Sequence, residues 1–391
     1  MKVLITDGIE QEGLNRLLEA NLEVNNVKLS QEELLKQIAQ YDALIVRSAT
    51  KVTKEVIDAA DSEKMKIIGR AGVGTDNIDE KAASEKGIVV VRAPSGATNA
   101  VAELTIGTML DLSRKIIYSN NQLKQGNWEK GNGYEIAGKT IGIIGYGRIG
   151  KRVAQKARGL EMDVICYDSY PNMDSEHLVS LEELIQKSDY ITLHVPKQEK
   201  PVISINELNK MKKTAYLIDV SRGGNVDEDA LYEALKSGTI AGAAKDVFKK
   251  EGKKGEKFQN KLLELGDSNF IALPHLGAST KEGQRKTSIE IANIIVNYLK
   301  HCDISDAVNL IKKKDEENMM TYNLVIMHED KPGVFADIDS AIRKYDINIF
   351  KQKTDYLTNG YALTRYQNNK HSPPELISNI KAIKEIRFVK Q

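Results

Sequence analysis

The feature that most constrains the fold of this chain is a glycine-rich turn that lies far inside it. Residues 141–150 read IGIIGYGRIG, a short apolar run that breaks into glycines. Such a run is typical of the first strand, turn and helix of a dinucleotide-binding fold. The 391-residue chain has room for two or three domains, so we expect a further domain before this turn.

Three glycines of the turn, Gly145, Gly147 and Gly150, suit a pyrophosphate. The first permits a tight turn, the second lets the backbone approach the ligand, and the third lets helix and strand pack closely. Asp168 ends the next predicted strand, DVICYD, where an acid can bind the ribose hydroxyls and repel a 2′-phosphate. We therefore expect NAD rather than NADP. The alternative is a glycine-rich turn beside an unrelated surface aspartate.

Strand-like and helical runs alternate on both sides of this turn. Before it, KVLIT, ALIVRS, KIIGRAG and IVVVRAP alternate with helical patterns such as QEELLKQIAQ. After it, DVICYD, YITLHVP, AYLIDVS, IAGAAKDVF and NFIALPH do the same. This alternation predicts parallel sheets covered by helices. One long helical pattern spans about 100–125, and SIEIANIIVNYLK, near 288–300, follows the last strand.

The composition changes abruptly at residues 311–320, IKKKDEENMM, which we interpret as a linker. The remainder shows the β-α-β-β-α-β order of a ferredoxin-like unit. The predicted fold class is therefore α/β, with two doubly wound parallel-sheet domains and a C-terminal ferredoxin-like domain.

The composition argues against several classes of function. The 56 Lys and Arg residues nearly balance the 55 Asp and Glu residues, so there is no electrostatic case for nucleic acid or lipid binding. No apolar run is long enough to span a membrane, and the N-terminus does not resemble a signal peptide. Cys166 and Cys302 fit no metal or redox spacing. We expect a cytoplasmic protein without a metal site.

Reactive side chains follow three predicted strands, where ligands of open α/β sheets bind. They are Arg222, Asp246, Glu251 and His275. An arginine there could bind a substrate carboxylate, and a histidine oriented by a carboxylate could move a hydroxyl proton during hydride transfer. The alternatives are that Arg222 caps a strand, that His275 is an ordinary loop histidine, and that Glu251 belongs to a solvated, lysine-rich segment.

Several motifs, in this order, resemble the D-2-hydroxyacid dehydrogenases: GYGRIG…YD, HVP, DVSRGGNVDEDAL, AGAAKDVF and LPHLGAST. The resemblance runs from the N-terminus to about residue 310. It implies that an NAD domain (98–288) is inserted into a discontinuous substrate domain (1–97 and 289–310). It also implies that Arg222, Glu251 and His275 are catalytic. The implied cofactor contacts are Gly145, Gly147, Arg148, Ile149, Gly150, Asp168, His194, Val195, Pro196, Ser221, Asp246 and His275.

Two segments, ALIVRSATKVT and IIGRAGVGTDNID, resemble the family members that act on 3-phosphoglycerate. The implied reaction is NAD-dependent oxidation of D-3-phosphoglycerate to 3-phosphohydroxypyruvate, the first step of serine biosynthesis. The implied substrate contacts are Arg47, Thr50, Lys51, Arg70, Gly72, Val73, Gly74 and Arg222. Arg47 and Lys51 also suit a phosphate on chemical grounds, because they follow a strand end. Solvated surface charge is the alternative for both.

Two other functions fit the same pattern. One is another 2-hydroxyacid dehydrogenase, such as a hydroxypyruvate or glyoxylate reductase, and the other is a non-catalytic NAD-sensing scaffold. The chain also departs from the family pattern at Arg92 and Ala97, where asparagines are common, and at two positions near the predicted site. Gly252 stands where proline usually follows the catalytic glutamate, and Lys245 replaces the usual apolar residue before Asp246.

Residues 319–391 resemble an ACT domain of the kind that binds serine in such dehydrogenases. The resemblance implies that His328 and Asn348 contact the amino acid across a dimer of these domains. Asp330 stands where an asparagine is usual. The alternative is a unit that only dimerises. We expect a homodimer or homotetramer with serine as an effector.

Overall fold

The computed structural model describes residues 1–129, 131–169, 177–252, 255–266, 269–310, 322–356, 360–368 and 383–390. The chain forms two compact units, residues 1–310 and residues 311–391. The predicted linker, residues 311–320, lies outside the described residues.

The first unit begins with a five-stranded parallel sheet in the order β2-β1-β3-β4-β5. Its strands are β1 (Lys2–Ile5), β2 (Glu23–Asn26), β3 (Ala43–Val46), β4 (Ile67–Arg70) and β5 (Val89–Arg92). The helices between them are α1 (Gln11–Glu19), α2 (Gln31–Gln37), α3 (Lys54–Ala59) and α4 (Glu80–Glu85), with a 3-10 turn at Ile38–Gln40. The sequence analysis missed β2, because its polar residues, EVNN, form a mostly exposed edge strand without an apolar pattern.

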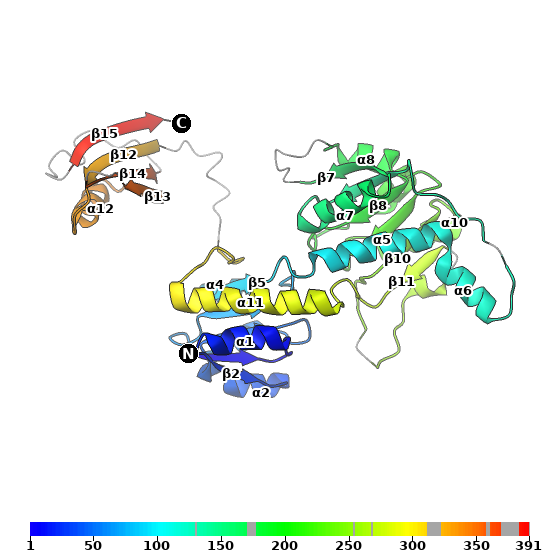
Figure 1. The fold of residues 1–391 in the computed structure, drawn as a ribbon, viewed down its shortest axis with the longest axis horizontal. Coiled ribbons are helices and arrows are strands. Elements are labelled where there is room, and N and C mark those ends of the chain that lie inside the picture. Colours follow the sequence, from blue (N-terminus) through cyan, green and yellow to red (C-terminus); the bar gives the residue numbers. More distant parts are fainter. Residues whose placement is uncertain are drawn as a thin grey trace. The chain divides into compact units, whose positions relative to one another are not determined.

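The last helix of this unit, α11 (Lys281–His301), packs on the same sheet and lies beside α1 (Figure 1). Glycines allow the close approach. A Cβ on Gly69 would lie 3.0 Å from side-chain atoms of both Ile291 and Ile295, and one on Gly13 would lie 2.6 Å from the carbonyl oxygen of Ser288. The core of the N-terminal sheet is thus completed by a helix from the far end of the unit.

A six-stranded parallel sheet has the order β11-β10-β9-β8-β6-β7. Its strands are β6 (Thr140–Ile144), β7 (Asp163–Tyr167), β8 (Tyr190–Leu193), β9 (Tyr216–Asp219), β10 (Gly242–Lys245) and β11 (Phe270–Ala272). Its helices are α5 (Thr98–Arg114), α6 (Ile116–Lys124), α7 (Arg148–Arg158), α8 (Leu181–Lys187), α9 (Ile205–Lys210) and α10 (Glu228–Ser237), with a 3-10 turn at Lys261–Glu264. Apolar side chains of α5 and α7 fill one face of the sheet, and those of α8, α9 and α10 fill the other. The strand order reverses between β6 and β8, where such sheets bind ligands at the carboxyl ends of their strands.

The helix expected over about 100–125 is broken in two. Lys115 takes a left-handed conformation (φ 52°) between α5 and α6. The side chain of Asp111 caps the second helix, since its Oδ1 accepts a hydrogen bond from the backbone N–H of Ile117 at 2.8 Å. The expectation of one continuous helix was wrong, because the apolar pattern continues through the break and no glycine or proline marks it.

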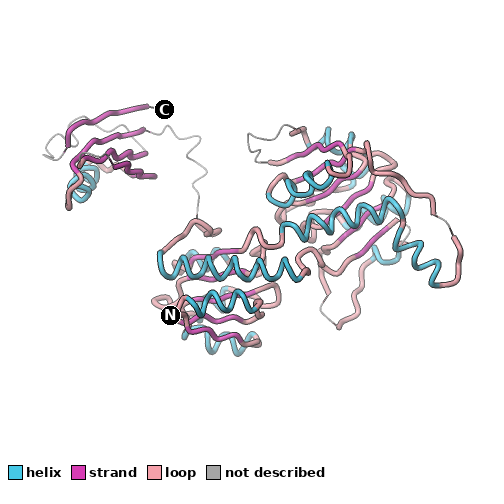
Figure 2. Tube along the Cα trace, in the orientation of Figure 1, coloured by secondary structure: helices cyan, strands magenta, loops and turns pink. Residues whose placement is uncertain are grey.

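The C-terminal unit is an antiparallel sheet in the order β13-β14-β12-β15, with one described helix on its face (Figure 2). Its elements are β12 (Tyr322–Glu329), α12 (Val334–Lys344), β13 (Ile349–Tyr356), β14 (Tyr361–Asn368) and β15 (Ile383–Lys390). The second predicted helix would lie within residues 369–382, outside the described residues. Two parallel sheets with helices and a smaller antiparallel sheet confirm the predicted fold class.

Candidate active site

The glycine turn joins β6 to the N-terminus of α7. Gly145 has a φ of +94°, and a Cβ there would lie 2.7 Å from the carbonyl oxygen of His194. A Cβ on Gly150 would collide with the Gly145 carbonyl, whereas one on Gly147 would meet no described atom within 4 Å. The turn is therefore closed towards the protein and open in front of Gly147. A helix N-terminus at such an opening suits the pyrophosphate of a dinucleotide.

Asp168 follows β7 and lies beside the glycine turn. Its Oδ2 accepts a hydrogen bond from the backbone N–H of Tyr146 at 2.8 Å. Strands β6 and β7 are neighbours in the sheet, so the acid and the turn meet at the same carboxyl edge. This arrangement fits a ribose next to a pyrophosphate. Arg148 and Ile149, two further predicted contacts, open α7.

The predicted cofactor contacts after β8 and β9 are tied together by Asn225. Its Nδ2 donates to the carbonyl of Pro196 at 3.1 Å and to Ser221 Oγ at 3.0 Å. In the same segment, burial lowers the pKa of His194 to about 3, so this imidazole is neutral at physiological pH. Its Nε2 lies 3.0 Å from the Thr192 hydroxyl. His194 therefore suits a packing or hydrogen-bonding role rather than proton transfer.

The structure brings His275, Glu251 and Asp246 together. His275 Nδ1 lies 3.0 Å from the Glu251 carboxylate, so Nε2 is the ring nitrogen left for a substrate hydroxyl. The His275 backbone takes a left-handed conformation (φ 56°), and its N–H donates to the carbonyl of Asp246 at 2.9 Å. The Asp246 carboxylate accepts the backbone N–H groups of Leu276 and Gly277 at 2.7 and 2.8 Å. Asp246 therefore holds the turn that presents the histidine.

The imidazole of His275 and the carboxylate of Glu251 form a hydrogen-bonded pair in which each shifts the pKa of the other. The hydrogen bond that His275 donates to Glu251 raises the pKa of the imidazole above its usual 6.5, and burial opposes this shift. Burial alone would raise the pKa of Glu251, but the hydrogen bond and positive charge of His275, a backbone hydrogen bond and the charge of Arg222 together lower it. Burial raises the pKa of Asp246. A histidine held in this way suits general acid–base chemistry near neutral pH.

Arg222 follows β9 and reaches the loop after β4 of the first sheet. Its Nε donates to Asp76 Oδ2 at 3.0 Å, and its Nη1 donates to the carbonyl of Ser221 at 2.7 Å. A Cβ on Gly74 would collide with this guanidinium in its present position, so the side chain of Arg222 packs directly against the glycine. Arg222 thus links the carboxyl end of β9 to the loop after β4 of the other parallel sheet.

A further arginine, Arg70, lies close enough to both Arg222 and Arg47 to feel their charges. Burial, together with the positive charges of Arg222 and Arg47, lowers the pKa of Arg70 to about 10. Arg70 Nε is buried and has no hydrogen-bond partner among the described residues. The guanidinium lies against Gly72, which has no Cβ to exclude it. A buried guanidinium that lies near two further positive charges forms a site that favours a bound anion.

The loop after β3 presents the other predicted substrate contacts. Asp7 accepts the backbone N–H groups of Arg47 and Thr50 at 2.7 and 3.1 Å, and the Thr50 hydroxyl at 2.8 Å. Asn77 Nδ2 donates to the carbonyls of Arg47 and Thr50 at 2.8 and 2.7 Å. Lys51 is exposed at the end of this loop. The loop is therefore held in one shape before any ligand binds.

Sequence reasoning missed Asp7, Asp76, Asn77 and Asn225. Each is an ordinary polar residue of a loop, and only the fold places it beside a functional side chain. The strand-end position of Asp7 offered a signal, because carboxyl ends of parallel strands meet at one edge. Val73, the remaining predicted contact, has its carbonyl held by Arg92 Nη1 at 2.9 Å.

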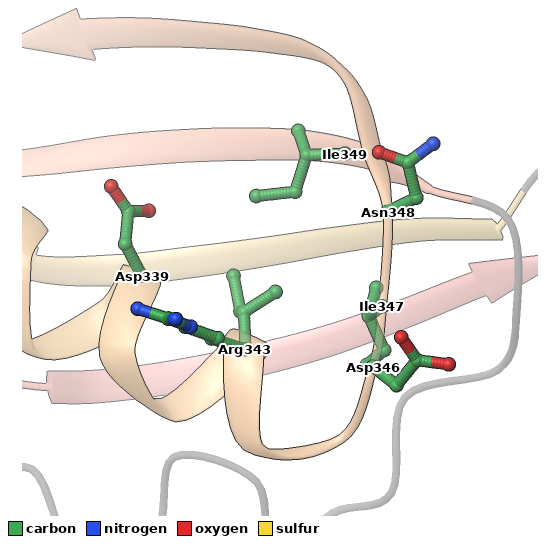
Figure 3. Close-up of a pocket in the computed structure, with 7 residues that line it drawn as sticks. Asp339, Arg343, Asp346, Ile347, Asn348 and Ile349 are labelled. Atoms are coloured by element: carbon green, nitrogen blue, oxygen red, sulfur yellow. The ribbon is translucent and has the colours of Figure 1, made fainter.

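The predicted regulatory residues occupy different environments in the C-terminal unit. His328 is buried in β12, with Nδ1 2.9 Å from the Glu329 carbonyl oxygen and Nε2 2.9 Å from the Thr364 hydroxyl. Asp330 is exposed in the following turn. Asn348 is exposed between α12 and β13, beside a cavity of about 500 Å³ (Figure 3). The described lining of this cavity is Asp339, Ile342, Arg343, Asp346, Ile347, Asn348 and Ile349, and it does not include His328.

The described residues contain neither a cluster of metal ligands nor a membrane-spanning helix. No three His, Cys, Asp or Glu side chains gather there as a metal site. No described helix is both long and apolar enough to cross a membrane.

Comparisons with known proteins give a consistent result. The family model "D-isomer specific 2-hydroxyacid dehydrogenase, NAD binding domain" matches residues 106–277. D-3-phosphoglycerate dehydrogenase of Archaeoglobus fulgidus is 40% identical over 376 residues, covering 92% of this chain and 69% of the relative. Hydroxypyruvate reductase of Thermotoga maritima is 42% identical over 305 residues, covering 76% and 98%. The NAD+-bound 3-phosphoglycerate dehydrogenase structure from Entamoeba histolytica has a TM-score of 0.68 at 28% identity, covering 79% of this chain and 99% of that one.

Proposed function

This chain belongs to the D-isomer specific 2-hydroxyacid dehydrogenases, and we propose that it oxidises D-3-phosphoglycerate to 3-phosphohydroxypyruvate, the first step of serine biosynthesis. It is an NAD-dependent oxidoreductase. Two relatives named D-3-phosphoglycerate dehydrogenase, from Archaeoglobus fulgidus and Methanocaldococcus jannaschii, match 92% of the chain at 40% and 39% identity. The observation that best supports this substrate is that Arg70 lies near the positive charges of both Arg47 and Arg222.

The proposed substrate has an anion at each end, a carboxylate and a phosphate. Arg222 lies next to the His275 side of the site, where it acts on the pKa of His275, and it suits the carboxylate. Arg47 and the preformed loop after β3 suit the phosphate. Arg70, with its buried Nε, lies within reach of both charges. A 2-hydroxy acid without a phosphate would leave part of this positive charge without a partner.

The chemistry follows from the positions of these side chains. When bound, NAD accepts the hydride from C2 of the substrate. His275 takes the proton of the C2 hydroxyl through Nε2, and Glu251 stabilises the imidazolium that forms. Arg222 neutralises the carboxylate and polarises the developing carbonyl. Asp246 fixes the turn that carries His275, so the proton acceptor does not have to be positioned during the reaction.

The function is tested by measuring NADH formation with 3-phosphoglycerate and, separately, NADH oxidation with hydroxypyruvate and glyoxylate. We expect a higher kcat/KM for the phosphorylated pair of substrates. A clear preference for hydroxypyruvate would instead favour the function of the Thermotoga maritima relative. Absence of turnover with all of them, despite NAD binding, would favour a non-catalytic NAD-sensing scaffold.

Serine is the proposed effector of the C-terminal unit. Asn348 lies beside a cavity whose lining carries both signs of charge, from Asp339, Asp346 and Arg343 (Figure 3). These groups suit the ammonium and carboxylate of an amino acid. His328, in contrast, already uses both ring nitrogens within the unit, so its part in the binding site requires a change of these contacts. The complete site would form across a dimer of these units.

A homodimer or homotetramer is the proposed assembly. The segment after α5 exposes large apolar side chains, among them Ile116 (55% exposed), Leu123 (56%) and Trp128 (81%). Several large exposed apolar side chains in one segment suit an interface between subunits. Light scattering at several protein concentrations tests the assembly, and a monomer at all of them would contradict it.

A location in the cytoplasm is also part of the proposal, in keeping with the free thiols of Cys166 and Cys302.

A further inference from the structure

Lys245 forms a buried ion pair with Asp219 inside the six-stranded sheet. Its Nζ lies 2.7 Å from Asp219 Oδ2, and the two side chains are 1% and 0% exposed. The two residues are direct partners in the register of β9 and β10, and each is the last residue of its strand. The pair therefore lies at the carboxyl edge that also carries Arg222 and His275.

The stability of the sheet does not explain this pair. Removing two charges from water is unfavourable, and well-packed apolar side chains of similar volume often stabilise a protein as much or more. Lys245 Nζ also lies 5.8 Å from the centre of the Phe248 ring, in largely apolar surroundings. A charge pair kept in such a place, at the edge that binds the ligand, points to a role in the site.

The Asp219 side of the pair leads to Arg222. While Oδ2 contacts Lys245, Oδ1 accepts the backbone N–H of Ser221 at 3.1 Å and its hydroxyl at 2.7 Å. Arg222 Nη1 in turn donates to the carbonyl of Ser221. The orientation of the Asp219 carboxylate, which Lys245 fixes, thus sets the start of the turn that presents the arginine.

The Lys245 side of the pair leads to His275. The next residue is Asp246. Its carbonyl oxygen accepts a hydrogen bond from the backbone N–H of His275 at 2.9 Å, and its carboxylate accepts hydrogen bonds from the two residues that follow the histidine. The carbonyl oxygen of Lys245 accepts a hydrogen bond from the backbone N–H of Leu273 at 2.8 Å. The ion pair therefore joins the strand end that holds the arginine to the strand end that holds the histidine.

We propose that Lys245 is a positioning residue, which through Asp219 holds Arg222 and His275 at the separation that the 2-hydroxy acid requires. The inference rests on the roles of these two residues in the proposed function. Lys245 does not touch the substrate. With Asp219 it forms an ion pair between the two strand ends that precede the turns carrying the two reactive groups.

The test is Lys245→Met, together with the double variant Lys245→Met/Asp219→Asn. The second variant removes the unpaired buried charge that the first would leave, while the asparagine oxygen can still accept from Ser221. We expect the KM for the hydroxy acid to rise and kcat/KM to fall by roughly 10- to 100-fold in each, since a misplacement of about 1 Å can have this effect. The Kd for NAD, measured by fluorescence titration, should change much less than this KM, because Ser221 and Asp246 are only two of the predicted NAD contacts and those at the glycine turn are untouched.

The matched control is Lys212→Met. Lys212 pairs with Asp189 at 2.9 Å beside the same sheet, but at the edge where Asp189 also binds the amino end of β6. This substitution should leave the KM for the hydroxy acid and the Kd for NAD unchanged. A purely structural role of Lys245 would lower the NAD-binding fraction and Vmax without changing KM. Unchanged KM in the folded variants, or loss of NAD binding in both, would overturn the proposal.

The test of the ion pair can be distinguished from the test of the proposed substrate. The rate of the unmodified enzyme with 3-phosphoglycerate tests that substrate alone. The ratio of variant to unmodified kcat/KM tests the pair with whichever 2-hydroxy acid the enzyme oxidises.

Discussion

At the residue scale, the reactive groups owe their properties to neighbours that are distant in the sequence. His275 takes its raised pKa from Glu251, 24 positions earlier in the chain. Arg222 is held by Asp76, 146 positions away, from a loop of the other parallel sheet. The identities of Arg222 and His275 as candidates were visible from their places after strands. Asp76 was not, because an aspartate in GTDNID is equally common as a turn residue.

The first prediction concerns Glu251→Gln. The oxidation needs a neutral imidazole as proton acceptor, so activity rises with pH through the pKa of His275. Because the carboxylate raises that pKa, the substitution should shift the rising limb of kcat/KM for oxidation to lower pH. The falling limb of the reverse reaction, which needs the imidazolium, should shift in the same direction. The measurement is the pH dependence of kcat/KM in both directions.

Glu256→Gln is the control, since Glu256 is an exposed glutamate of the same segment. It should leave both limbs in place. His275→Ala should lower kcat by roughly 10²- to 10⁴-fold, the usual contribution of a general acid or base. If Glu251→Gln left the profile unchanged, the hydrogen bond between the two side chains would not be the source of the histidine's acid–base behaviour.

At the element scale, buried strands and the glycine turn were predictable, whereas edges and breaks were not. The apolar runs of β1, β3, β4 and β6 carry a strong signal because both faces of a parallel sheet are covered. The edge strand β2 is polar and mostly exposed, so its sequence contains no apolar pattern that would indicate a strand. The break at Lys115 depends on a left-handed residue and a cap from Asp111, which no local pattern announces.

The second prediction compares two glycines. Gly145→Ala requires a left-handed alanine and places its Cβ 2.7 Å from the His194 carbonyl oxygen, so it should lower the melting temperature and abolish measurable NAD binding. Gly107→Ala, in the exposed interior of α5, meets no described atom within 4 Å and should raise stability by about 0.5–1 kcal/mol. Calorimetry and NAD titration check both. Normal NAD binding in Gly145→Ala would mean that the turn does not hold the cofactor.

At the scale of the whole molecule, the proposed active site and the proposed effector site belong to separate compact units. The proposed substrate site would use side chains that follow strands of both parallel sheets of the first unit, which the contact between Arg222 and Asp76 links. The family resemblance, rather than any local pattern, led to the expectation of a domain inserted into another. The sequence could not show how His328 would be engaged, because its partner Thr364 comes from a strand 36 positions later.

The third prediction follows from this separation. A chain ending after residue 318 should keep its dehydrogenase kcat/KM within about 3-fold, because the first unit has its own cores, and it should lose inhibition by serine. Asn348→Ala should abolish inhibition in the full chain. The measurements are initial rates and calorimetry with serine. No heat and no inhibition with millimolar serine in the unmodified protein would contradict the effector proposal.

The most direct test of the central claim is the selectivity of Arg47→Ala between 3-phosphoglycerate and D-glycerate, which differs from it only by lacking the phosphate. Loss of a charged hydrogen-bond partner is worth about 1.5–3 kcal/mol. We therefore predict that kcat/KM for 3-phosphoglycerate falls by roughly 10- to 100-fold, while that for D-glycerate changes by less than about 3-fold. Equal losses with both substrates would contradict the account, because Arg47 would then support the fold and not read the phosphate.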